Sequence, residues 1–380
     1  MDVVAFIFPL LSLKPEIVAF IIKCMDEIDI VTFSLISRGT KNLVESIGFT
    51  ATDITLTFEE GAELGIEFRA DKLLIYLTEW NEEWREGIDD PYDMTPADVV
   101  YVTLLHGYGA AHYKVPHFQV RDWIEHFLFI FHKRFIDCFD LGLSGCKFTF
   151  DSISREISRN SVRHLVLPYG QNHAYGKQLI NYFLTPRITI SPDEFPERDS
   201  FLRVLVQNLD LVRFNGGGDL TLDDLLITNS KAICIYQGQT MTMKTINRFI
   251  KLWQPGSNPR LECFVIHLNE VWLPQDLFKG ITYTEMNDEI EVEFDKRDDY
   301  GLLDSNRVEN SPKTVVLPVM EISPLQSISG YKLKSKECQD LKLIVGGKMM
   351  ITHNLKMEML ANILMARLLQ ETREFLVLKR

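Results

Sequence analysis

Three histidines lie close together in the sequence, and histidine is the side chain that most often binds zinc or carries a proton at neutral pH. His106, His112 and His117 flank or border a glycine-rich segment. No H-E-x-x-H motif, neighbouring cysteine pair or carboxylate at helical spacing accompanies them, so the usual ligand set of a zinc site is missing. The spacing therefore predicts solvated loop histidines, and we expect no bound metal.

Two glycine-rich segments resemble phosphate-binding loops only in part. Residues 107–112 lack the third glycine of a dinucleotide fingerprint, and residues 216–219 lack the lysine of a P-loop. Residues 143–145 do not form the G-x-S-x-G turn of a serine hydrolase. The sequence thus predicts no catalytic residue, no cofactor and no enzyme, although its many carboxylates leave open an acid pair that spacing alone would not reveal.

The composition is that of a globular protein with several cores. The 380 residues are 46% hydrophobic and 11% aromatic, enough for two or three domains. A formal charge of −13 argues against a nucleic-acid partner. Six scattered cysteines without a C-x-x-C pair favour a reducing compartment. Asp2 and Pro9 interrupt the apolar N-terminus, and no run of about 18 uncharged apolar residues occurs, so we expect a cytoplasmic or nuclear protein without a membrane partner.

The elements nearest the N-terminus are expected to be three short helices within residues 8–48. Pro15 and Glu16 suit the first turn of a helix, and Ser37 suits an N-cap. The first helix is apolar over more than the stripe of about 100° that a surface helix buries. So small a unit cannot cover such helices by itself, so either the following domain or another protein must cover them.

This N-terminal pattern resembles the F-box, especially the variant of the nematode-expanded F-box group. The resemblance lies in segments 8–13, 16–17, 25–26 and 36–38, and it departs from the family at Lys14, where the family usually has proline.

The resemblance implies that these helices bind the Skp-type adaptor of SCF ubiquitin ligases, and a cullin through it, as an amphipathic helix set in a hydrophobic groove. Matching positions assign adaptor contacts to Leu10, Leu13, Pro15, Ile17, Ile21, Ile22, Met25 and Ile28.

The rest of the chain favours strands alternating with helices. Residues 54–58 and 64–68 alternate as a β-hairpin does. Farther on, apolar residues recur at relative positions 1, 4 and 6 in segments that begin at 136, 162, 209 and 261, and a segment that begins at Ser230 lacks only the first of them. The intervals of 26, 47, 21 and 31 residues approach the 20–29 of leucine-rich repeats, provided that the 47-residue interval hides a degenerate unit. A parallel sheet with an extended binding face is the expected result.

A second resemblance lies in residues 247–262, which closely resemble the most recognisable motif of the type 2 F-box-associated domain. Residues 222–226 and 229–231 resemble the same domain. The motif is interpreted as a helix, a tight turn and a strand, with structural rather than binding residues. The resemblance implies that the domain recognises a target protein.

The fold class predicted is α+β, with an N-terminal three-helix F-box and an irregular leucine-rich-repeat-like body. We assign the F-box to 8–48, a β-hairpin and connecting region to 49–125, the F-box-associated domain to 126–285, and a C-terminal hairpin with a capping helix to 286–380. The predicted function is that of a non-catalytic substrate receptor of an SCF-type ubiquitin ligase that binds an unidentified protein substrate. A protein-interaction scaffold or sensor outside any ligase is the alternative.

Overall fold

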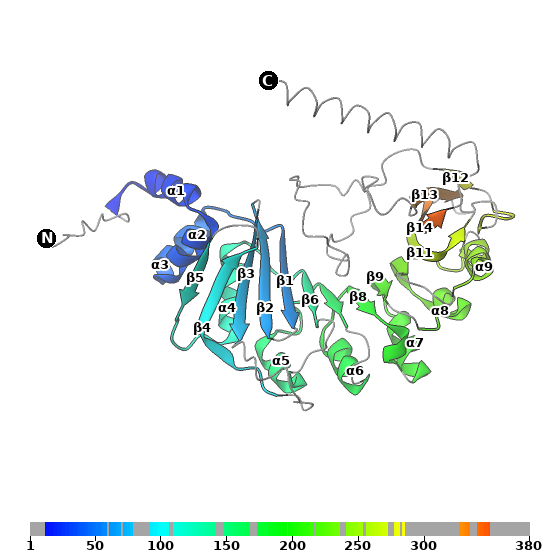
Figure 1. Ribbon diagram of the computed structural model, residues 1–380, viewed down its shortest axis with the longest axis horizontal. Coiled ribbons are helices and arrows are strands. Elements are labelled where there is room, and N and C mark those ends of the chain that lie inside the picture. The colour runs from blue at the N-terminus through cyan, green and yellow to red at the C-terminus, as the bar shows by residue number, and fades with distance from the viewer. Residues whose placement is uncertain are drawn as a thin grey trace, which may run out of the picture.

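The fold joins a small group of helices to one large mixed sheet, which makes it α+β (Figure 1). The computed structural model describes residues 12–58, 61–69, 71–78, 92–105, 109–141, 148–167, 173–195, 197–215, 218–235, 241–253, 256–272, 277–281, 283–285, 327–334 and 340–349. Within these residues fourteen strands form a single sheet.

Three helices occupy the N-terminal region, as the sequence predicts: α1 (Pro15–Cys24), α2 (Glu27–Leu35) and α3 (Arg38–Ser46). Proline stands at the start of α1. The Asp26 carboxylate accepts a hydrogen bond of 2.7 Å from the Asp29 backbone N–H and so caps α2. Ser37 and Thr40 form a reciprocal capping box at the start of α3. Local capping chemistry therefore sets where each helix begins.

An antiparallel meander follows the helices. It contains β1 (Asp53–Phe58), β2 (Ala62–Phe68), β3 (Asp71–Thr78), β4 (Pro96–Leu104) and β5 (Ala110–Tyr113), each paired with the next. The predicted hairpin at 54–58 and 64–68 is confirmed, with Leu56 opposite Leu64. Strands β4 and β5 extend the meander beyond what the sequence analysis assigned.

The central part of the sheet is parallel. Its strands lie side by side in the order β1, β6, β7, β8, β9, β10, β11 and β14. The bounds of the strands added here are β6 (Cys138–Asp140), β7 (His164–Val166), β8 (Arg187–Ile190), β9 (Leu209–Phe214), β10 (Ser230–Ile235), β11 (Cys263–Trp272) and β14 (Asp340–Met349). Apart from β1 and β14, these strands follow one another along the chain as they do across the sheet.

Helices connect successive parallel strands. They are α5 (Phe150–Glu156), α6 (His173–Tyr182), α7 (Arg198–Leu205), α8 (Leu222–Ile227) and α9 (Met243–Trp253), while α4 (Val120–Ile130) precedes β6. In Figure 1, helices α5, α6 and α7 lie on the same side of the strand row, below it in the view. Each unit thus consists of a strand and a helix.

The residues at relative position 4 of the sequence pattern form a continuous row across the parallel strands. Seven neighbouring strands place a buried apolar residue there in direct register: Leu56, Phe139, Leu165, Ile188, Val212, Ile233 and Phe264. Strand β8 lies within the 47-residue interval and contributes Ile188 and Ile190, both buried. It supplies a further strand–helix unit within this interval, with polar Thr185 at position 1, where β10 has Ser230.

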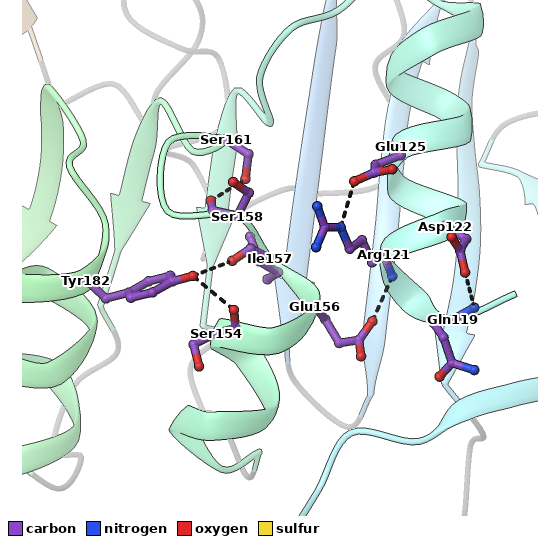
Figure 2. Close-up of polar contacts among 10 residues, drawn as sticks. All are labelled: Gln119, Arg121, Asp122, Glu125, Ser154, Glu156, Ile157, Ser158, Ser161 and Tyr182. Carbon is purple, nitrogen blue, oxygen red and sulfur yellow. Dashed lines mark hydrogen bonds and ion pairs between the residues drawn. The ribbon is translucent and has the colours of Figure 1, made fainter.

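Neighbouring helices are joined by side chains that bond to helix ends (Figure 2). Glu156, at the end of α5, accepts a hydrogen bond of 2.9 Å from the backbone N–H of Arg121 in the first turn of α4. The hydroxyl of Tyr182 on α6 donates to the carbonyls of Ser154 and Ile157, at 2.9 and 3.2 Å. Unpaired groups at helix termini are satisfied in this way by the next helix along the row.

The far end of the sheet becomes antiparallel again through β12 (Tyr283–Glu285) and β13 (Ser327–Lys334), which lie beyond β14. The hairpin that the sequence predicts near residues 331–345 is confirmed as the β13–β14 pair. The predicted capping helix lies outside the described residues. Helix α4 spans the predicted domain boundary at residue 125, and one sheet joins the segments on either side.

Candidate interaction surface at the N-terminal helices

Helix α1 has two apolar stripes that face different surroundings. Val18 and Ile22 lie one helical turn apart and are 3% and 0% exposed, so this stripe belongs to the core of the chain itself. Ile17 and Phe20, by contrast, are 46% and 67% exposed. An isolated exposed apolar residue is ordinary, but two of them three positions apart lie together on one helix face.

The exposed stripe of α1 is defined here by Ile17, Phe20 and Ile21. Ile21 is partly exposed and borders the other two at spacings of four residues and one residue. This pattern of anchors is the one that an amphipathic helix presents to a groove in a partner protein. The stripe is therefore a candidate docking surface.

The predicted adaptor contacts divide between this stripe and the core. Ile17 and Ile21 lie on the exposed stripe, and Pro15 is exposed at the start of the helix. Leu13, Met25 and Ile28 are partly buried and pack against the core, and Leu10 lies outside the described residues.

The assignment of Ile22 to a partner surface needs correction, because its side chain is fully buried in the core of this chain. Its neighbour Phe20, which the sequence analysis left out, is the most exposed residue of the stripe. A helix that is apolar nearly all round gives no signal in its own sequence as to which stripe the rest of the chain will cover.

The body of the protein holds α2 and α3 through polar side chains. The hydroxyls of Thr32 on α2 and Tyr113 on β5 lie 2.7 Å apart. His132 Nε2 lies 2.6 Å from the Glu45 carbonyl oxygen at the end of α3. Lys41 of α3 lies over the ring of Phe129 on α4, with Nζ 4.8 Å from the centroid. The helices are thus attached to the meander and to α4.

Two side chains between the N-terminal helices and the body, His126 and Lys41, have a lowered pKa. Burial, followed by the nearby charge of Lys41, lowers the pKa of His126 to about 3, and its Nε2 lies 2.9 Å from Ser34 Oγ on α2. Burial also lowers the pKa of Lys41, against the opposing effect of Glu125 and Asp122. His126 is therefore neutral at physiological pH and can share one hydrogen bond with Ser34.

The histidine cluster of the sequence does not appear as a metal site. Within the part of the chain that the structure describes, no three His, Cys, Asp or Glu side chains gather closely enough to hold a metal ion. His112 and His117 are exposed, whereas His106 lies outside the described residues. Nor is any helix among the described residues long and apolar enough to cross a membrane.

The segment that ends at β11 is held together by side chains of the predicted motif. Asn258 is 5% exposed, and its Nδ2 donates to the carbonyls of Leu225 and Thr228 at the end of α8, at 2.9 and 3.1 Å. The indole Nε1 of Trp253 donates to the Leu261 carbonyl at 3.0 Å. These contacts join α8, α9 and β11 into one unit.

Comparison with known proteins agrees with this packing. Residues 200–266, which run from α7 into β11, match the family described as F-box associated. We refer to residues 200–266 as the F-box associated segment, after the family that they match. It is also similar to the F-box associated domain-containing protein sdz-33 of Caenorhabditis elegans, with 22% identity over 316 residues that cover 74% of this chain and 87% of that protein. No solved structure matches the chain.

The motif residues of the F-box associated segment are structural, as the sequence predicts. Gly256 has φ +104°, which a side chain would strain, and its backbone N–H donates to the carbonyl of Trp253, the last residue of α9, at 2.8 Å. Arg260 Nη1 donates to Asn208 Oδ1 at 2.8 Å and to the Asn229 carbonyl at 3.1 Å. The side chains of Asn229 and Asn208 also bond at 2.8 Å. The motif therefore connects successive strand–helix units.

Proposed function

We propose that this chain is a substrate-recognition subunit of an SCF-type ubiquitin ligase, in which the N-terminal helices act as an F-box and bind a Skp-type adaptor. The observation that carries the proposal is the exposed stripe of α1. The opposite stripe of the same helix is already buried, so the helix is folded and fixed while Ile17 and Phe20 remain open to a partner. The F-box associated segment that follows it supports the same role.

The body is proposed to bind the target protein. Its successive parallel strands and connecting helices resemble a leucine-rich-repeat arrangement, and such arrays present extended surfaces suited to large partners. In this role the chain is not an enzyme and performs no chemical step. It brings lysines of a bound target near the ubiquitin-loaded partner of the cullin, so that a bimolecular transfer becomes effectively intramolecular.

Binding to a purified Skp-type adaptor tests this function. The double variant Ile17→Glu and Phe20→Glu places two charges on the exposed stripe and should weaken adaptor binding by at least ~100-fold, since buried anchors of an interface are each worth about 2 kcal/mol. Val99→Glu is the matched control, because Val99 is a similarly exposed apolar residue (44%) on β4. It should leave the affinity within about twofold, as surface substitutions usually do.

Two results would contradict the proposal. One is a wild-type chain that is folded, by its melting transition, yet does not bind the adaptor at micromolar concentration. The other is a double variant that binds as tightly as the Val99 control. Either result would favour a scaffold or sensor outside any ligase.

A further inference from the structure

Arg69 lies at the joint between the candidate docking helix and the sheet. It is in the turn between β2 and β3, far from α1 in sequence, yet its guanidinium reaches the end of that helix. Nη1 donates to the Met25 carbonyl at 2.8 Å and Nη2 donates to the Lys23 carbonyl at 3.1 Å. Carbonyls at a helix C-terminus lack partners within the helix, and an arginine that bonds two of them also offsets the negative end of the helix dipole.

The same guanidinium contacts the start of the next helix. Its Nη1 lies 3.6 Å from Glu27 Oε1 in the first turn of α2. Arg69 therefore links the end of α1, the beginning of α2 and the sheet. A planar group with several fixed donors restricts angles as well as distances, which a single charge does not.

The backbone of Arg69 is held in an unfavourable conformation. Its φ is +58°, in the left-handed region where a residue with a Cβ is uncommon. The side chain is packed as well, with its Cζ 5.2 Å from the ring centroid of Phe49 and 4.9 Å from that of Phe68. Glycine would suit this turn better, so the turn conformation alone does not account for arginine here.

We propose that Arg69 is a positioning residue that sets the direction in which α1 presents its exposed stripe relative to the sheet. The buried stripe of Val18 and Ile22 attaches α1 to the core, but apolar contacts are not directional. The hydrogen bonds from Arg69 fix the orientation. The consequence for ubiquitin transfer rests on the proposed function: a fixed α1 fixes where a body-bound target faces the ligase.

Three variants of Arg69 separate orientation from stability. Arg69→Ala removes the guanidinium and keeps the strained backbone, whereas Arg69→Gly removes the guanidinium and relieves the strain. Arg69→Lys keeps the charge but loses the planar pair of donors. If Arg69 serves only to stabilise the turn, the glycine variant should behave like the wild type. If Arg69 positions α1, the Arg69→Gly protein should be more stable than the Arg69→Ala protein, and α1 should be equally misoriented in both.

The orientation of α1 relative to the body is measured by double electron–electron resonance on the full chain. Spin labels are attached to a ketone-bearing amino acid introduced at the exposed positions of Glu16, on α1, and Ser158, before β7. We expect one narrow distance distribution in the wild type, at least a twofold wider one in Arg69→Gly and Arg69→Ala, and an intermediate width in Arg69→Lys. A glycine variant with the wild-type width overturns the inference.

A second measurement connects the orientation to the ligase. The chain, adaptor and cullin complex are reconstituted, and the body lysines that receive ubiquitin are mapped by mass spectrometry, so no target need be known. Arg69→Gly should spread the modification over more lysines at unchanged adaptor affinity. An unchanged pattern overturns the consequence for transfer. A wild-type chain that does not bind the adaptor would instead refute the proposed function and leave the distance measurement valid.

Discussion

His126 Nε2 and Ser34 Oγ lie 2.9 Å apart, and this contact joins α4 to α2 inside the core. The imidazole is buried between the N-terminal helices and the body, in ring contact with Phe118 and Phe127. A charge at this position would lie near Lys41 without water around it. The attachment of the helices to the body therefore depends on a neutral histidine.

The buried histidines predict a dependence of stability on pH. Burial lowers the pKa of both His126 and His164 from 6.5 to about 3. Between these values the unfolded chain binds protons that the folded chain does not. Above pH 6.5 the histidines therefore do not reduce the free energy of unfolding. As the pH falls below 6.5, this free energy decreases by up to about 1.4 kcal/mol per pH unit for each histidine.

Urea unfolding at pH 7.0 and pH 5.5 measures this effect. His126→Gln keeps a nitrogen able to face Ser34 but does not titrate, so the difference between the two pH values should shrink in the variant. Its absolute stability can be lower, because the aromatic contacts change. If the free energy of unfolding changed equally between the two pH values in wild type and variant, His126 would be charged in the folded protein at pH 5.5.

The two stripes of α1 predict opposite responses to truncation. Ile22→Ala should destabilise the chain by about 3 kcal/mol, because it leaves a cavity in the core. Ile17→Ala, on the exposed stripe, should change the free energy of unfolding by less than about 0.5 kcal/mol. Denaturant titrations of the two variants check this. Similar losses for both would show that Ile17 is buried in solution.

Local patterns in the sequence predict much of this fold. The helix starts follow from capping residues such as Asp26 and Ser37, whose side chains bond backbone N–H groups only a few residues away. Period-2 alternation predicts β1 and β2. The recurrent positions 1, 4 and 6 predict the parallel strands, and their register places position 4 in one row.

Features that depend on distant contacts could not be predicted in this way. Which stripe of α1 is buried depends on the core that the rest of the chain forms, so the sequence assigns Ile22 to a partner and gives no sign that Phe20 is exposed. Arg69 carries no sequence signal, because its guanidinium donates hydrogen bonds to carbonyls more than forty positions earlier.

The strained turn at Arg69 predicts an order of stability among its variants. Alanine keeps a φ of +58° without any of the contacts that offset its cost, whereas glycine adopts this conformation freely. Arg69→Gly should therefore be more stable than Arg69→Ala by about 1 kcal/mol. Thermal or urea unfolding of the purified variants measures the difference. The reverse order would indicate that the turn relaxes out of the left-handed region once the guanidinium is removed.

Asn258 should be the most sensitive polar residue of the F-box associated segment. Its buried Nδ2 donates to the carbonyls of Leu225 and Thr228 near the end of α8. Asn258→Asp keeps the shape but turns an acceptor toward those carbonyls. We expect a loss of about 3 kcal/mol or more, since a buried acceptor without a donor costs the desolvation of a charged group.

A matched control for Asn258 is its neighbour Ser257, which is exposed and donates to the Leu252 carbonyl from the end of α9. Ser257→Ala should cost no more than about 1 kcal/mol, because water can replace the hydroxyl. Urea titration compares the two variants. Adaptor binding should survive in both wherever the chain remains folded, because the N-terminal helices lie beside the β1–β5 end of the strand row, far from β11 (Figure 1). If Asn258→Asp lost adaptor binding while retaining its full unfolding free energy, the motif would have a role at the interface that its contacts in the core do not explain.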